Sequence, residues 1–183
     1  EHVDYHIGRL ISSLADLEIL EDTLIYYILG DNGASAEGGV DGTFNEYVTI
    51  NALVKEIQDL MTPEFVLAHI DEFGTPAAYN HYAAGWALAM DTPYQWTKQI
   101  ASHWGGTRNG TIVHWPNGIK AKGEVRTQFH HVIDVAPTVL EAAGLPHPSF
   151  VNGIQQAPLE GVSMAYSFDD AEAAARHTTQ YFE

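Results

Sequence analysis

Hydrophobic positions near the start of the chain change from a helical spacing to an unbroken run. Between residues 2 and 20, apolar side chains recur at intervals of three and four, and this spacing predicts an amphipathic helix. Residues 23–29 then read Thr-Leu-Ile-Tyr-Tyr-Ile-Leu, which is too short for a helix without a polar face and is rich in strand formers. We therefore expect a strand that is buried on both faces and that packs with the helix in an α/β unit.

The downstream pattern extends this α/β arrangement. Residues 74–104 are rich in aromatic side chains but have no clean period, so we expect an irregular excursion, packed either beside a site or simply against the sheet. Alternation near the carboxyl end favours a final strand over residues 177–182. The other expected elements are helices over residues 46–61 and 128–143, which pack on the sheet with the first helix, a second short helix over residues 63–73, and a strand over residues 111–115.

A short polar sequence follows the first strand. Gly30 and Gly33 end the apolar run and permit a sharp turn, and Asp31 and Asn32 lie between them. In open α/β sheets, ligands collect at the carboxyl ends of the strands. A carboxylate beside an amide carbonyl suits a hard cation such as Ca²⁺ or Mg²⁺, whereas Asp-Asn-Gly in isolation is more often only turn chemistry.

Composition excludes several classes of function. The 183 residues include 8 basic and 24 acidic side chains, and the formal charge of −16 argues against nucleic acid and anionic membranes as partners. The chain has no cysteine, which excludes disulfides and thiolate catalysis within it. No apolar run approaches the length of a membrane span, and the localisation and oligomeric state stay open.

The basic residues are nevertheless unevenly distributed. Five of the eight fall within residues 98–126, beginning with Lys98 and Arg108. A local positive region on an acidic protein could bind a small anionic substrate, although a solvated face is the simpler interpretation. His130 and His131 point about 100° apart on the expected helix, so capping or packing by these side chains is favoured over a shared metal.

Several stretches together resemble type I sulfatases of the alkaline phosphatase superfamily, in particular bacterial arylsulfatases. Residues 22–35 resemble the metal-binding strand of that family, and Lys98 with the following Gly-Gly-Thr-Arg-Asn and His-Trp-Pro-Asn-Gly resembles its active-site lysine segment. Residues 130–144, 159–163 and 176–183 resemble later parts of the same domain. The resemblance implies an alkaline-phosphatase-like sandwich, with a mixed, mainly parallel sheet between helices.

The resemblance also implies a reaction, the hydrolysis of small-molecule sulfate monoesters. The family uses a formylglycine nucleophile and a Ca²⁺ ion, which would take two oxygen ligands from Asp31 and Asn32. Lys98 would bind the sulfate and the bridging ester oxygen, with its ammonium pointing towards Asp31 and Asn32 and with Arg108 held behind. His103 is the alternative to Lys98 within the same segment.

The chain departs from the family pattern in two respects. It contains no Cys/Ser-x-Pro-x-Arg nucleophile motif and no amino-terminal aspartate pair, both of which lie earlier in the family's sequences. We therefore expect residues 1–183 to be a partial catalytic domain, cut at both ends and inactive alone. The alternatives are a phosphodiesterase or phosphonate monoester hydrolase of the same superfamily, and a non-catalytic binding domain in which Asp31 and Asn32 only form a turn.

Overall fold

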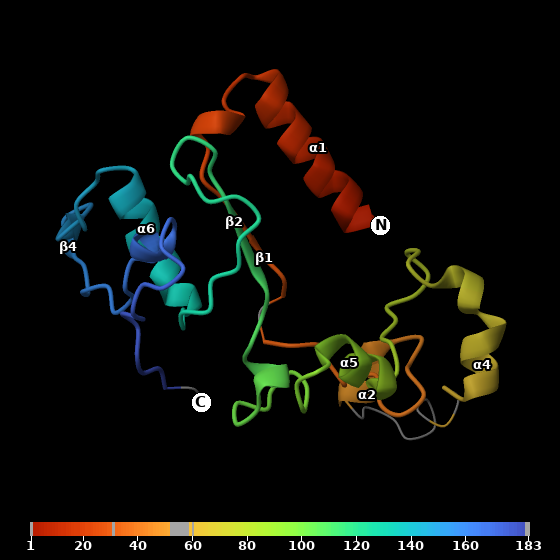
Figure 1. Cartoon of the computed structure of the whole chain (residues 1–183). Helices are drawn as coiled ribbons and strands as arrows, with labels where there is room; N and C mark the ends of the chain where they lie inside the picture. Colours follow the sequence, from red (N-terminus) through yellow and green to blue (C-terminus); the bar gives the residue numbers. More distant parts are fainter. Residues whose placement is uncertain (1, 31, 52–58, 60, 182–183) are drawn as a thin grey trace. The chain divides into compact units, whose positions relative to one another are not determined.

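The computed structural model describes residues 2–30, 32–51, 59 and 61–181. The chain forms two compact units. The first unit consists of residues 1–27 and 112–182, and the second mainly of residues 28–111. The described residues contain helices and two small antiparallel sheets, in agreement with an α/β class (Figure 1). A mainly parallel sheet is not among the described elements and stays a prediction.

The first unit begins with helix α1, which spans His2–Asp16 and is shorter than the expected 2–20. Glu18 adopts the left-handed conformation with φ 57° and ends the helix. The Ile19 amide donates to the Leu14 carbonyl at 3.1 Å and the Glu18 amide to Ala15 at 2.9 Å. These are the two bonds of a Schellman cap, with glutamate where glycine is usual. None of the described side chains of α1 is buried, so the expected packing of this helix on the sheet is not observed.

Strand β1, Ile25–Ile28, lies within the predicted range and pairs with β2, Thr111–His114. The pair is antiparallel, because Glu21 accepts from the Asn117 amide at one end and the Leu29 amide donates to Gly110 at the other. The prediction of burial on both faces is wrong for the described chain: no β1 residue is buried, and Leu29 just beyond it is 48% exposed. A two-stranded ribbon lacks the layers that would cover both faces of its apolar side chains.

The remainder of the first unit is built around a buried carboxylate. The helix expected over 128–143 is a short 3₁₀ turn, Val132–Asp134, followed by α6, Val135–Ala142, because His131 is still extended (φ −126°, ψ 159°). Asp134 is 0% exposed and accepts hydrogen bonds from the His131 amide (2.9 Å), the Val162 amide (2.8 Å) and His177 Nδ1 (2.8 Å). It thus joins three segments of the unit.

The two adjacent histidines cap and pack, as the sequence favoured. His131 Nδ1 accepts from the Ile133 amide at 3.5 Å and caps the 3₁₀ turn, and the His130 ring lies 5.8 Å from the Tyr166 ring. The prediction of a strand over residues 177–182 is wrong for residues 177–181, which have no regular structure. His177 instead turns inward and binds Asp134. Residue 182 lies outside the described residues. The other elements of the first unit are 3₁₀ turns Leu20–Asp22 and Ala165–Ser167 and the hairpin of β3, Phe150–Val151, and β4, Ile154–Gln155.

The second unit consists of short helices joined by long loops. Helix α2 spans Glu46–Asn51, and residues 52–58 and 60 of the expected helix 46–61 lie outside the described residues. Helix α4 spans Pro63–Ala68 with Pro63 in its first turn, and Thr62 Oγ1 accepts from the Phe65 amide at 3.2 Å as an N-cap. The other elements are α5, Ala84–Asp91, and 3₁₀ turns Ile70–Glu72 and Trp104–Gly106.

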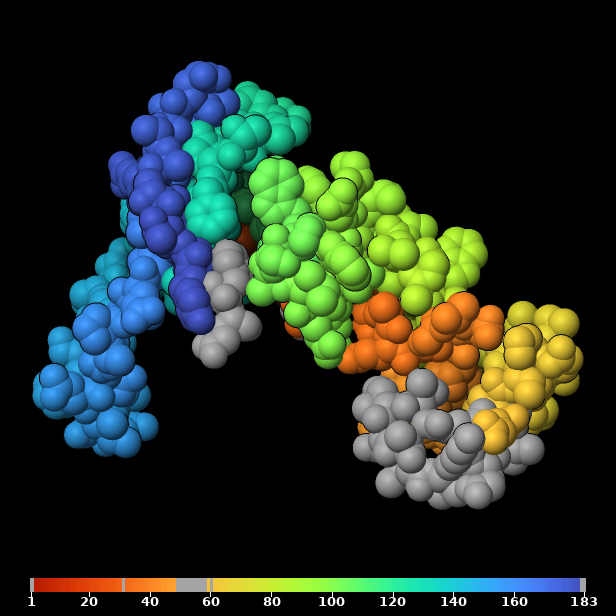
Figure 2. All heavy atoms as spheres, turned by 90° about the horizontal axis from the view of Figure 1, so that it is seen from below, coloured from red at the N-terminus to blue at the C-terminus, as the bar shows by residue number. Residues whose placement is uncertain are grey.

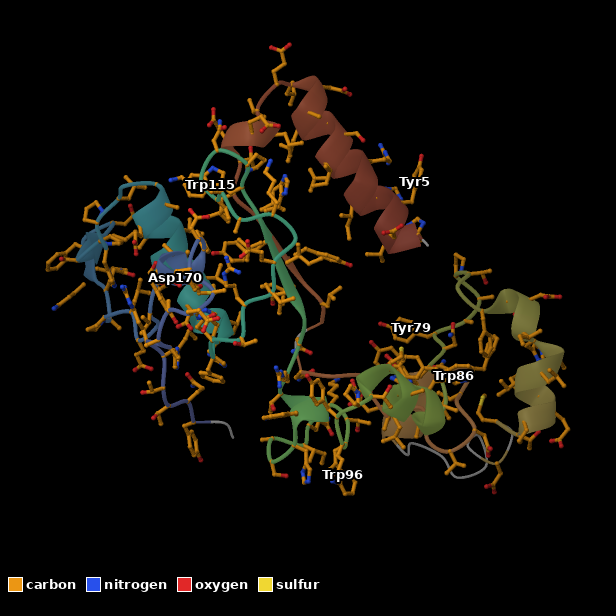
Figure 3. The ribbon with its side chains drawn as sticks, viewed as in Figure 1. Tyr5, Tyr79, Trp86, Trp96, Trp115 and Asp170 are labelled. Atoms are coloured by element: carbon orange, nitrogen blue, oxygen red, sulfur yellow. The ribbon has the colours of Figure 1, made fainter. Side chains whose placement is uncertain are left out.

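The aromatic stretch 74–104 thus includes one helix, α5, and is otherwise irregular. Bridges Thr43↔His81 and Asn45↔Tyr79 attach it to the loop before α2, and these segments lie side by side in Figure 2. Many of its aromatic rings stay on the surface, including Trp86 at 66% and Trp96 at 53% exposure (Figure 3). Within the described residues, none of the helices combines the length and the apolar character that crossing a membrane requires.

Candidate active site

The turn that follows β1 closes on a second glycine-rich loop. Gly30 and Gly33 have φ of 75° and 85°, in the left-handed region that favours glycine. A Cβ on Gly33 would overlap the Gly105 carbonyl, so the two backbones touch there. Asp31 lies outside the described residues, and Asn32 lies within them between the two glycines. The glycines predicted to shape this turn therefore also permit its contact with the segment that carries Lys98.

The segment from Gln95 to Gly106 is folded tightly onto itself. The Gly105 amide donates to the Gln95 carbonyl at 3.0 Å, and a Cβ on Gly105 would overlap the Trp96 carbonyl. The Lys98 amide donates to the Ala34 carbonyl at 3.0 Å. The backbone of Lys98 is thereby attached to the turn after β1, across 64 residues of sequence, at the end of the strand where the sequence placed the site.

The side chain of Lys98 has a partner that the sequence did not indicate. Its Nζ lies 3.3 Å from Glu37 Oε2, and both side chains are about one-third exposed, at 32% and 31%. The hydrogen bond from the Ser35 hydroxyl, opposed by partial burial and reinforced by Lys98, holds the pKa of Glu37 below its usual value. Whether the ammonium also reaches Asp31 lies outside the described residues, so its expected direction stays a prediction.

A second carboxylate, Asp91, supports the same turn. It is the last residue of α5, and its Oδ1 accepts from the Ala34 amide at 2.9 Å. Its Oδ2 is buried and has no hydrogen-bond partner among the described residues. Sequence reasoning missed Asp91, since a single acid in an aromatic stretch without a clean period carries no local signal of a site. Only the fold shows that it lies against a turn 57 residues earlier.

Replacing Asp91 with alanine in the full-length protein is expected to loosen this turn. One hydrogen bond to the Ala34 amide is lost, so deuterium exchange over residues 33–36 should accelerate about fivefold. Asp91→Asn is the matched control, because its amide oxygen can still accept from Ala34. Mass spectrometry of exchanged peptides measures both variants, and equal exchange in Asp91→Ala and the unmodified protein would disprove this role.

The two other candidates in the lysine segment make contacts within their own loop. His103 Nδ1 lies 2.8 Å from Ser102 Oγ, and the His103 ring meets the Trp96 ring edge-on at 5.9 Å. The Arg108 guanidinium lies over the rings of Tyr94 and Trp104, at 5.2 and 4.8 Å from their centroids. These contacts agree with the expected structural role of Arg108, and the catalytic role of His103 stays a prediction.

The chemistry of the donors around the turn suits a hard cation. Asn32 carries an amide oxygen in this turn, and the Asp91 carboxylate lies against the same turn. Within the described ranges, which leave out Asp31, no group of three or more His, Cys, Asp or Glu side chains is arranged to hold a metal. The described residues therefore fit Ca²⁺ in donor type and would supply only part of its six to eight ligands.

Comparison with known proteins identifies relatives of this chain. The sequence model of the family described as Sulfatase matches residues 1–145. An uncharacterized sulfatase of Schizosaccharomyces pombe is 27% identical over 148 residues, which are 81% of this chain and 24% of that protein. An arylsulfatase of Klebsiella aerogenes is 27% identical over 167 residues, 90% of this chain and 32% of that protein. The chain thus spans about a quarter to a third of the length of these relatives. Because the family match covers well over half of the residues, the chain belongs to the sulfatase family.

Proposed function

We propose that this chain is part of a calcium-dependent, arylsulfatase-type enzyme that hydrolyses small-molecule sulfate monoesters. The observation that carries the proposal is the bond from the Lys98 amide to the Ala34 carbonyl, which attaches the lysine segment to the turn containing Asn32. Membership of the sulfatase family and the similarity to an arylsulfatase support it. The proposal includes the family's sandwich fold, with a mainly parallel sheet that other parts of the protein complete.

The proposed reaction divides the work between residues of this chain and residues outside it. Asp31 and Asn32 would hold the Ca²⁺ ion, which when bound neutralises the sulfate charge and acts as a Lewis acid. Lys98 would donate to the bridging ester oxygen, where negative charge develops as the bond to sulfur breaks. The nucleophile, a formylglycine, would come from sequence before this chain, so residues 1–183 alone should not hydrolyse sulfate esters.

Replacing Asp31 with alanine in the full-length protein tests the metal site. Loss of a charged ligand is expected to lower bound calcium below one equivalent and to reduce turnover of an aryl sulfate at least about a hundredfold. Calcium content is measured by atomic emission after dialysis, and turnover by release of the phenol. Asp41→Ala removes an exposed acid from the following loop and is the matched control.

The outcomes separate the candidate functions. Unchanged calcium content in Asp31→Ala would remove the metal assignment and favour a simple turn. Faster hydrolysis of an aryl phosphonate or a phosphodiester than of the aryl sulfate would favour the related hydrolases of the superfamily. No hydrolysis of any of the three by the full-length protein would overturn the enzymatic proposal.

A further inference from the structure

Glu37 collects side-chain donors from two loops that are far apart in sequence. Its Oε2 accepts from the Ser35 hydroxyl at 2.7 Å and from Lys98 Nζ at 3.3 Å, and its Oε1 accepts from Gln99 Nε2 at 3.1 Å. The Glu37 amide donates back to Ser35 Oγ at 3.2 Å. Both carboxylate oxygens are therefore used, and consecutive residues 98 and 99 are held by the same acid.

The backbone around Lys98 is constrained on both sides. Trp96 and Gln99 have φ of 65° and 75°, in a region that residues other than glycine rarely adopt. Such conformations persist only where surrounding contacts enforce them, and they occur preferentially at functional sites. The contacts observed in this segment are the Lys98–Ala34 backbone bond and the Gln99–Glu37 side-chain bond.

Hydrogen bonds also hold the loop between the β1 turn and Glu37. The Ser35 amide donates to the Tyr82 hydroxyl at 3.0 Å. Asp91 binds the Ala34 amide between Glu37 and the β1 turn. The Ser35 hydroxyl and the Lys98 ammonium hold the pKa of Glu37 below its usual value, so both stabilise the carboxylate form that binds Lys98.

From this arrangement we infer that Glu37 is a positioning residue for Lys98. It holds the ammonium beside the turn after β1, and releases it to the anionic sulfate group when an ester binds. The inference rests on the proposed function. An exposed lysine on a flexible stem would have to be ordered at each turnover, whereas a lysine already restricted by Glu37 needs only to exchange one oxygen partner for another.

The ordinary alternative is a surface ion pair without consequence. Isolated exposed pairs contribute little, because water competes and two long side chains must be ordered. The Glu37 pair differs because Ser35 and Gln99 fix the carboxylate from two further directions, and because the lysine backbone is bonded to the same turn. The two interpretations make different predictions for the amine of Lys98 and for turnover.

The first measurement follows the amine directly in the full-length protein. In Glu37→Gln, acylation of Lys98 by a limiting amount of acetic anhydride at a fixed pH should be about threefold faster, since the carboxylate partner is lost. Lys120 of the same protein is the internal reference, and peptide mass spectrometry gives both rates. Glu124→Gln, which removes the carboxylate 2.9 Å from Arg126 Nη1 in the first unit, is the matched control and should leave Lys98 unchanged. An unchanged Lys98 rate in Glu37→Gln would overturn the inference.

The second measurement is a kinetic double-mutant cycle with an aryl sulfate. Glu37→Gln should lower kcat about tenfold with a smaller change in KM, and Glu37→Asp should recover part of the loss. In a Lys98→Ala background the same substitution should have almost no further effect. An equal loss in both backgrounds would show a merely structural role and overturn the inference.

If Glu37→Gln does not fold, Ser35→Ala replaces it, with a smaller effect in the same direction. If the unmodified protein does not hydrolyse the sulfate ester, the proposed function fails, and the acylation rates still decide whether Glu37 controls Lys98.

Discussion

Replacement of Lys98 by alanine in the full-length protein is expected to lower kcat for sulfate-ester hydrolysis by about a hundredfold, with a smaller change in KM. Charge develops on the bridging oxygen only as the ester bond breaks, so an ammonium at that oxygen stabilises the transition state more than the bound substrate. The backbone bond between Lys98 and Ala34 places this residue beside the turn that contains Asn32. Steady-state kinetics with an aryl sulfate measure kcat and KM separately.

A series of leaving groups makes this prediction specific. Esters of acidic phenols need little help from a proton or a cation, so Lys98→Ala should affect them less than esters of weakly acidic phenols. Lys120→Ala is the matched control, because Lys120 is an exposed lysine of the first unit. A loss of the same size for every ester, or an unchanged kcat, would reject Lys98 as the group that meets the leaving oxygen. His103→Ala would then be the variant to test in the same series.

Local patterns in the sequence predicted the elements that local forces determine. The strand at residues 25–28, the second strand at 111–114 and the Thr62-Pro63 start of α4 all lie where the pattern placed them. The apolar run also indicated burial on both faces, which the described chain does not show. Burial of a strand depends on which other layers of the fold cover it. A hydrophobic run indicates only that burial of the strand would be favourable.

The supporting residues of the site could not be found in this way. Glu37 lies in an acidic, glycine-rich stretch that has the composition of a solvated loop. Asp91 is a single acid within the aromatic stretch 74–104. Their hydrogen bonds to Lys98 and to Ala34 span 61 and 57 residues. Contacts at that separation depend on the fold as a whole, and no local period or turn signal records them. The prediction of Lys98 rests instead on the resemblance to sulfatases, which compares residues in their order along the chain.

The same limit applies to Asp134, which lies within the helix expected over residues 128–143. Its side chain does accept from the His131 amide, in the manner of a cap. It also binds the Val162 amide and His177, which are 28 and 43 residues away. Burial by itself would raise the pKa of Asp134, but these hydrogen bonds outweigh it and hold the pKa below its ordinary value.

Asp134→Ala is expected to destabilise the first unit by about 3 kcal/mol, because two amides and an imidazole are left buried without their acceptor. The side chain is 0% exposed, so water cannot replace it without opening the unit. Asp169→Ala is the matched control: Asp169 accepts from the Lys120 and Ala121 amides at 2.7 and 2.9 Å but is exposed, so water can take its place and the loss should be much smaller. Urea unfolding, together with deuterium exchange at Val162, measures both variants.

The pH dependence supplies an independent check on Asp134. Its pKa is lower in the folded state, so its carboxylate contributes stability that is fully present above the unfolded pKa of about 3.9 and is lost as the pH falls through the lower folded value. The difference in unfolding free energy between the unmodified protein and Asp134→Ala should therefore shrink as the pH falls below about 4. If this difference in unfolding free energy does not shrink between about pH 4 and pH 2, the ionised carboxylate does not join the Val162 and His177 segments to α6. The alanine variant would then lose stability through packing alone.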